Sequence, residues 1–103
     1  MELLPTELKV RLPPLLSQEA ADEPVVFARY YLPGTLWSWY VIEGEDEEGD
    51  FRFFGFVTGL ADEFGHFNLS ELQSLLGPGG ETVQRDLGFI EGKLTDVVPA
   101  PDL

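Results

Sequence analysis

The sequence predicts an α+β domain in which an antiparallel meander sheet of three to four strands is packed by two short helices. Two segments rich in aromatic and β-branched residues, 36–42 and 51–57, predict adjacent strands. The eight residues between them include six carboxylates, which indicates a hairpin with an acidic, hydrated tip. A capped, leucine-rich segment farther along the chain predicts a helix packed on the sheet.

The length of 103 residues predicts a single domain, 1–103, with one hydrophobic core. A hydrophobic fraction of 44% provides enough apolar side chains for that core. We expect an N-terminal helix and connector over 1–24 and a β-meander over 25–58. A helix over 68–76 and a flexible, proline-rich tail over 94–103 complete the expected order.

The N-terminal region has leucines on one helical face. Leu4, Leu8 and Leu12 recur at every fourth position, which predicts a short helix. Thr6 is its expected N-cap, and the prolines at 13 and 14 end it. The apolar face is expected to dock on the sheet.

The first strand is expected over 25–32, directly after Pro24. Pro33 and Gly34 supply the fixed φ and the tolerance of positive φ that a tight turn needs. The first strand should therefore pair antiparallel with the second.

The second strand carries apolar side chains on both faces. Alternation places Trp37 and Trp39 on one side and Tyr40 and Ile42 on the other. We expect the helices to cover one face, and either the remaining segments or a partner to cover the other, because an exposed aromatic patch favours association. A homodimer through the second face is one of the open alternatives.

The region after the third strand predicts a loop and then a helix. Glycines and acids over 58–66 favour the loop. Asn68 as N-cap and Glu71 three positions later fit a capping box, and Gly77 marks the helix end. Residues 81–90 predict at most one edge strand.

The net charge of -13 comes from 19 acidic and 6 basic side chains, and it disfavours binding to nucleic acids and anionic membranes. It favours a cationic partner, although a high charge also serves solubility alone. The absence of cysteine excludes disulfides, thiolate zinc sites and thiol nucleophiles. No apolar stretch approaches the roughly 20 residues of a membrane span and no secretion signal is recognisable, so a cytoplasmic location is expected.

Several short sequence motifs resemble those of a known family in order and spacing. They are Leu3-Leu4-Pro5, Leu12-Pro13-Pro14, Trp37-Ser38-Trp39-Tyr40, Phe53-Phe54-Gly55, Phe67-Asn68-Leu69-Ser70-Glu71-Leu72 and Val83-Gln84-Arg85-Asp86-Leu87. In these motifs the chain resembles the bacterial family called domain of unknown function 2958 (DUF2958). The resemblance covers most of the chain and implies residence on plasmids and other mobile elements. It implies no catalytic residues, and the acidic insert at 43–50 is where this member is expected to differ.

His66 is the single histidine of the chain. With Asp62 and Glu63 nearby, it has the setting of a general base oriented by a carboxylate. A lone histidine beside a turn is more often a structural hydrogen-bonding group. We therefore predict no catalytic residue.

A candidate ligand site combines His66 and Arg85 with Trp37 and Trp39, whose rings could stack on a ligand. The structural alternative places both tryptophans in the core. Arg85 would then form an ion pair with Asp86 rather than bind an anionic ligand.

A metal site is the third alternative, because Glu45, Asp46, Glu48 and Asp50 could surround a hard cation such as calcium. The glycine that an EF-hand loop needs at its sixth position is replaced by Asp50 or Phe51, depending on the starting residue. We therefore predict no metal and no cofactor.

These observations favour a non-enzymatic protein-interaction domain. Closely spaced carboxylates on a two-stranded support resemble a phosphate backbone, which predicts a DNA-mimic inhibitor or an accessory factor of a DNA-binding or DNA-processing protein. The alternative is a small ligand-binding or enzymatic accessory domain that uses residues 60–67 with Arg85. The carboxylates expected to form the interaction surface are Glu43, Glu45, Asp46, Glu47, Glu48 and Asp50.

Overall fold

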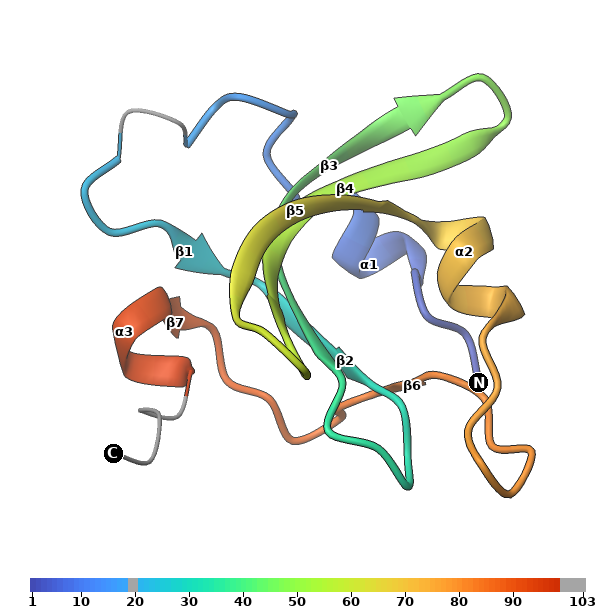
Figure 1. Ribbon diagram of the computed structural model, residues 1–103. Coiled ribbons are helices and arrows are strands. Elements are labelled where there is room, and N and C mark those ends of the chain that lie inside the picture. Colours follow the sequence, from blue (N-terminus) through green and yellow to red (C-terminus); the bar gives the residue numbers. More distant parts are fainter. Residues whose placement is uncertain (19–20, 99–103) are drawn as a thin grey trace.

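The protein is built around a curved antiparallel sheet of five strands (Figure 1). The computed structural model describes residues 1–18 and 21–98. Strand order across the sheet is β5-β4-β3-β2-β6, and every neighbouring pair is antiparallel. The strands are β2 (Ala28–Tyr31), β3 (Ser38–Glu47), β4 (Asp50–Thr58), β5 (Glu63–Asn68) and β6 (Gln84–Arg85).

A second, two-stranded sheet and three short helices complete the described part of the chain. The small sheet pairs β1 (Val25–Val26) with β7 (Gly92–Lys93). The helices are α1 (Thr6–Lys9), α2 (Leu69–Ser74) and α3 (Leu94–Val97). Figure 1 shows α3 and β7 beside β1, away from α2. The predicted α+β class and antiparallel sheet are confirmed, with one or two more strands and one more helix than expected.

The first face of the five-stranded sheet carries the main core. Trp39 and Val41 of β3 pack there with Phe53 of β4, under Leu8 of α1 and Leu72 of α2. All five side chains are buried. The expected docking of both predicted helices on one sheet face is thus observed.

The second face of the same sheet has its own smaller apolar cluster. Tyr40 and Ile42 of β3 are buried there, and Leu94 and Val97 of α3 pack against them. The predicted alternation of β3 is confirmed. The C-terminal segment is what covers part of this face.

The α3 helix lies where the sequence predicted the start of a flexible tail. Its apolar residues are partly buried against the cluster of Val26, Tyr40 and Ile42, and the backbone N–H of Leu94 donates to the carbonyl of Pro24 at 3.0 Å. Local propensity gave no sign of this helix because its stability comes from the packing. The rest of the predicted tail, residues 99–103, lies outside the described residues.

Two other predicted elements differ in extent. The first predicted strand is divided at Phe27 into β1 and β2, which belong to different sheets. Thr6 is the first residue of α1 rather than its cap, and the helix ends at Lys9. The turn at Pro33 and Gly34 forms as predicted, with Gly34 at φ 78.

The α2 helix begins as the capping pattern predicts. The backbone N–H of Asn68 donates to the Glu71 carboxylate at 3.2 Å. The helix ends at Ser74, short of the predicted residue 76, and Leu76 instead pairs with Thr82 in an isolated bridge and is exposed.

Across the described residues, no helix has the length and apolar character to cross a membrane.

Candidate functional site

The acidic hairpin, residues 43–50, is mostly strand. β3 runs through Glu47 and β4 begins at Asp50, so the turn itself is only Glu48 and Gly49. Both turn residues have positive φ, 46 and 85, as a type I′ turn requires. The sequence predicted a longer hydrated tip, and that prediction is wrong for the residues nearest the sheet.

A β-bulge decides where Glu43 points. Pairing shifts between Val41, which lies opposite Gly55, and Glu43, which lies opposite Phe54, so Ile42 is the extra residue. The extra residue moves the Glu43 side chain from the core face to the second face. There it is 3% exposed, so the prediction that all six carboxylates are hydrated is wrong at this position.

The Glu43 carboxylate holds a crossing segment, residues 13–18, which we call the strap. The backbone N–H groups of Leu16 and Gln18 donate to the two carboxylate oxygens at 2.8 and 2.6 Å. The charge is therefore satisfied by two backbone donors rather than by a cation. The sequence did not suggest this role, because the partners are 25 and 27 residues away.

Further hydrogen bonds fix the strap to the sheet. The backbone N–H of Leu15 donates to the Glu45 carboxylate at 2.8 Å, and the N–H of Gly44 donates to the Pro13 carbonyl at 3.0 Å. The Gln18 side chain donates to the carbonyl of Val25 at 3.1 Å and accepts its N–H at 2.8 Å. The strap and the base of the acidic hairpin are thus one hydrogen-bonded unit.

The other carboxylates of the acidic hairpin contact neighbouring side chains. Asp46 lies 2.9 Å from the Lys9 ammonium of α1, and Glu47 lies 3.8 Å from the Arg52 guanidinium. Asp50 accepts hydrogen bonds from the Ser70 hydroxyl and backbone N–H at the start of α2. The hydrogen bonds from Ser70, followed by that from the Phe51 backbone, hold the pKa of Asp50 below its ordinary value.

The outer part of the acidic hairpin remains exposed and highly charged. Residues 45–48 are four consecutive acids, and all four are exposed. In Figure 1 this end of the β3–β4 hairpin extends beyond the rest of the sheet. The hairpin therefore presents a fixed anionic surface to solvent.

His66 lies on a strand rather than in the predicted loop. It belongs to β5, and its ring centroid is 5.0 Å from that of Phe54 on β4. Glu63 is an odd number of residues away and faces the other side of the sheet. The arrangement of a histidine oriented by this carboxylate is not formed.

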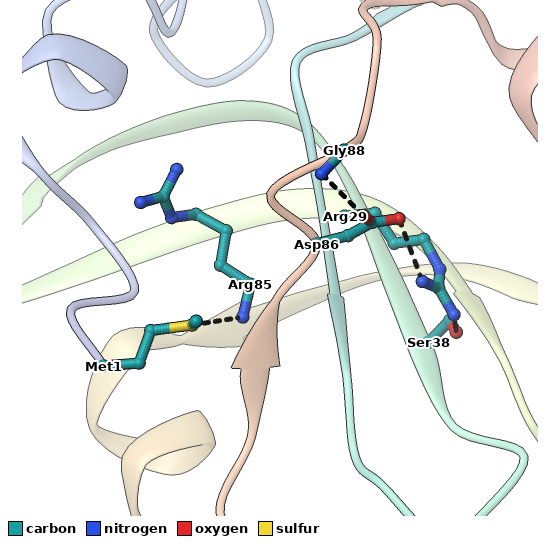
Figure 2. A network of polar contacts seen from close by, with 6 residues as sticks. All are labelled: Met1, Arg29, Ser38, Arg85, Asp86 and Gly88. Carbon is teal, nitrogen blue, oxygen red and sulfur yellow. Dashed lines mark hydrogen bonds and ion pairs between the residues drawn. The ribbon is translucent and has the colours of Figure 1, made fainter.

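Arg85 lies at the opposite edge of the sheet from His66, because β6 and β5 are the two end strands. Asp86 pairs with Arg29 at 3.1 Å, and Figure 2 shows the Arg85 side chain pointing away from it. The backbone N–H of Arg85 contacts the Met1 sulfur at 3.0 Å. The predicted Arg85–Asp86 ion pair and the predicted grouping of Arg85 with residues 60–67 are both wrong.

Arg85 instead lines a cavity of about 530 Å³ at the β6 edge. Arg11 also lines it, with the carboxylates of Glu7, Asp86 and Glu91. Arg11 is paired with Glu91 and Asp86 with Arg29, so most of these charges are already neutralised within the chain. The cavity does not have the cationic excess that an anion site needs.

Both tryptophans belong to the main core, Trp39 as a buried residue and Trp37 as a partly buried one packed against it. Trp39 is 7% exposed, and its ring stacks on that of Trp37 with centroids 6.2 Å apart. Trp37 also covers Gly59, where a Cβ would come within 2.5 Å of the ring. Both are placed as the core interpretation predicts.

A second cavity, of about 510 Å³, lies between the strap and the second sheet face, beside His66. We call it the aromatic cavity. No sequence pattern indicated it, because its lining comes from the strap, from the connector at 21–24 and from three strands. The lining residues are Leu16, Gln18, Ala21, Asp22, Pro24, Ile42, Glu43, Phe54, Phe64 and His66.

Metal-ligating side chains are not clustered in the structure that residues 1–18 and 21–98 form: no three His, Cys, Asp or Glu residues gather there in a way that would hold an ion. The acidic hairpin explains why. Its carboxylates alternate between the two faces of a ribbon and point to the strap, α1 and α2 in turn.

Comparison with known proteins found one relationship. No curated protein and no solved structure matches the chain. The family model described as a protein of unknown function, DUF2958, matches residues 3–97, which is nearly the whole chain. The protein therefore belongs to the DUF2958 family.

Proposed function

We propose that the protein is a non-enzymatic interaction domain whose acidic hairpin binds a basic partner protein. The observation that carries the proposal is the row of four exposed acids, residues 45–48, on a ribbon anchored at its base. A net charge of -13 extends the attraction to the whole molecule and speeds the encounter with a cationic surface.

The rigidity of the ribbon supports this proposal. The strap holds one face of the hairpin through Glu43 and Glu45, while Lys9 and Ser70 hold the other carboxylates Asp46 and Asp50. A surface that is ordered before binding loses less conformational entropy when a partner arrives.

A DNA-binding or DNA-processing protein is the partner we propose. Closely spaced carboxylates on a two-stranded support resemble the row of phosphate charges along a DNA backbone. Four consecutive acids on such a ribbon support inhibition by DNA mimicry, or an accessory role on a DNA-binding protein. The frequent residence on mobile elements that the family resemblance implies would be consistent with a partner of that kind.

Charge reversal of the turn tests the proposal. The double variant Glu47→Lys/Glu48→Lys alters charge where no strap contact is made, and Glu2→Lys/Asp96→Lys reverses two exposed acids elsewhere. Pull-downs from host lysate at low and high salt should retain a salt-sensitive DNA-binding protein with the wild type and the control variant, but not with the hairpin variant. Equal retention of the partner by all three proteins would mean that the hairpin carboxylates do not bind it.

Ligand binding by residues 60–67 is the second candidate function. The aromatic cavity favours it, because Phe64 and His66 of β5 line a space of about 510 Å³ that is mostly apolar. Arg85 is not part of this site. Substitution of His66 by alanine should weaken any ligand bound there and leave hairpin binding unchanged.

A further inference from the structure

The β5 strand offers an open backbone edge. β5 pairs with β4 on one side, and it is the end strand of the five-stranded sheet formed by the described residues. Its six residues include neither the lysine nor the proline that commonly protect edge strands. β6, the other end strand, has only two residues. β5 is therefore the longer edge at which a further strand could pair.

An aromatic shelf lies beside this edge on the second sheet face. Phe64 is 52% exposed, and its ring stacks on that of Phe54 with centroids 5.9 Å apart. His66 packs against the same Phe54 ring at 5.0 Å. Side chains of an added strand would meet these rings, because neighbouring strands share their faces.

The aromatic cavity continues from this shelf toward the strap. Leu16 lines the cavity, and its side chain is 68% exposed. Its backbone has φ 73, a left-handed conformation that bulky residues rarely adopt. The Glu43 carboxylate stabilises that conformation by accepting the Leu16 N–H at 2.8 Å. A strained backbone thus displays an apolar side chain at the cavity, as binding sites often do.

The charges near this edge select the partner. Asp62 and Glu63 are exposed at the start of β5, and Asp22 lines the aromatic cavity. A second copy of the chain would bring another net charge of -13 to the same place. Electrostatic complementarity therefore favours a basic occupant over self-association.

We propose that the outer edge of β5 and the aromatic cavity together bind an extended, basic segment of a partner protein. The segment adds a strand to the sheet through backbone hydrogen bonds, and its apolar side chains on the second face pack on Phe64 and His66. One of them enters the cavity beside Leu16. Basic side chains on the other face pair with Glu63. This surface is separate from the acidic hairpin and does not require it.

The proposal can be tested with purified protein and a synthetic peptide. The probe is an acetylated and amidated peptide that alternates lysine with valine and has one central phenylalanine. Backbone amide NMR titration should shift the signals of residues 63–68 and of Phe54. The same peptide with N-methyl groups along one edge should bind about tenfold more weakly, because it cannot extend the sheet.

Two protein variants separate the surface from general charge attraction. Phe64→Ala should weaken the peptide about tenfold, whereas Leu36→Ala, at another exposed apolar residue, should not. The hairpin variant Glu47→Lys/Glu48→Lys should bind the peptide like the wild type, so failure of the proposed hairpin function and failure of this proposal give different results.

Three outcomes would overturn the proposal. Shifts confined to residues 43–50 would place the peptide on the acidic hairpin. Equal affinity for the methylated peptide would mean that the side chains bind without strand addition. A dimer in sedimentation that Phe64→Ala dissociates would assign the edge to a second copy of the chain.

Discussion

At the scale of single residues, Glu43 shows how the same amino acid has different roles along one hairpin. It is buried and accepts two backbone N–H groups of the strap, whereas Glu48 is exposed at the turn. Composition alone places both among the exposed acids. The difference arises from the bulge at Ile42, which the sequence analysis did not predict because Tyr40, Val41 and Ile42 all favour regular strand.

Substitution of Glu43 by glutamine should destabilise the fold. One carboxylate oxygen would become an NH₂ group that faces a backbone N–H, so one buried donor would lose its acceptor. We expect the free energy of unfolding, measured with urea, to fall by about 1–3 kcal/mol. Glu48→Gln is the matched control and should change it by less than about 0.5 kcal/mol. Similar values for the two variants would contradict the role assigned to the strap contacts.

The lowered pKa of Asp50 predicts how the stability of the fold depends on pH. Its pKa is lowered from 3.8 in the folded protein, mainly by the Ser70 hydroxyl and then by the Phe51 backbone. Because the unfolded chain binds the proton more readily, this contribution is fully present above pH 3.8 and is lost as the pH falls toward the folded pKa. Urea unfolding across this range should therefore show a smaller loss of stability in Asp50→Asn than in the wild type. An identical pH dependence would mean that Ser70 does not stabilise the carboxylate.

At the scale of elements, β5 is the main difference between sequence and structure. Residues 58–66 have the glycines and acids of a loop, yet residues 63–66 of that segment form strand. Gly65 lies opposite Gly55 of β4, so two residues of low strand propensity pair with each other. Tertiary pairing, together with Phe64 and Phe67 on opposite faces, overrides the local preference.

The two paired glycines should respond differently to alanine. A Cβ at Gly55 would lie 2.1 Å from the Tyr40 carbonyl oxygen, whereas a Cβ at Gly65 would meet nothing within 4 Å. Gly55→Ala should therefore lower the free energy of unfolding by about 1–3 kcal/mol. Gly65→Ala should preserve it or raise it by up to about 1 kcal/mol, because alanine restricts the unfolded chain. Thermal or urea unfolding of the two variants would measure this, and equal losses would contradict the close approach of β3 and β4.

The elements that could be predicted are those with local signals. The alternation of β3, the turn at Gly34 and the cap at Glu71 each follow from a few adjacent residues, and all three are observed. The short α3 helix and the strap depend on contacts with distant residues. Those contacts stabilise segments whose own sequences do not specify a structure.

At the scale of the whole molecule, the strand order of the sheet decides which residues can form a site together. It separates residues of the predicted ligand site and brings together others that the sequence analysis did not connect. His66 and Arg85 are on opposite edge strands, so they cannot form one site. The aromatic cavity instead brings Leu16 of the strap to Phe64 and His66 of β5. Neither the separation of His66 from Arg85 nor the approach of Leu16 to Phe64 could be predicted without the strand order, because the residues of each pair are far apart in the chain.

The acidic insert also has two roles at this scale. Its inner carboxylates connect the hairpin to the strap and to the elements on the core face, through Glu43, Asp46 and Asp50. Its outer part, residues 45–48, is exposed and is where we propose that the partner binds. Removal of the whole insert would also remove the hydrogen bonds of Glu43 and Glu45 to the strap, so substitutions at Glu47 and Glu48 allow the cleaner test.

Calorimetric titration of the partner retained in the pull-down into the protein, repeated over a range of salt concentrations, would show whether the hairpin carboxylates bind that partner. Wild type and Glu2→Lys/Asp96→Lys should bind with an affinity that falls steeply as salt screens the charges. Glu47→Lys/Glu48→Lys should bind far more weakly, with a shallower dependence on salt. Wild-type affinity and an unchanged salt dependence in the hairpin variant would contradict the claim that these carboxylates bind the partner.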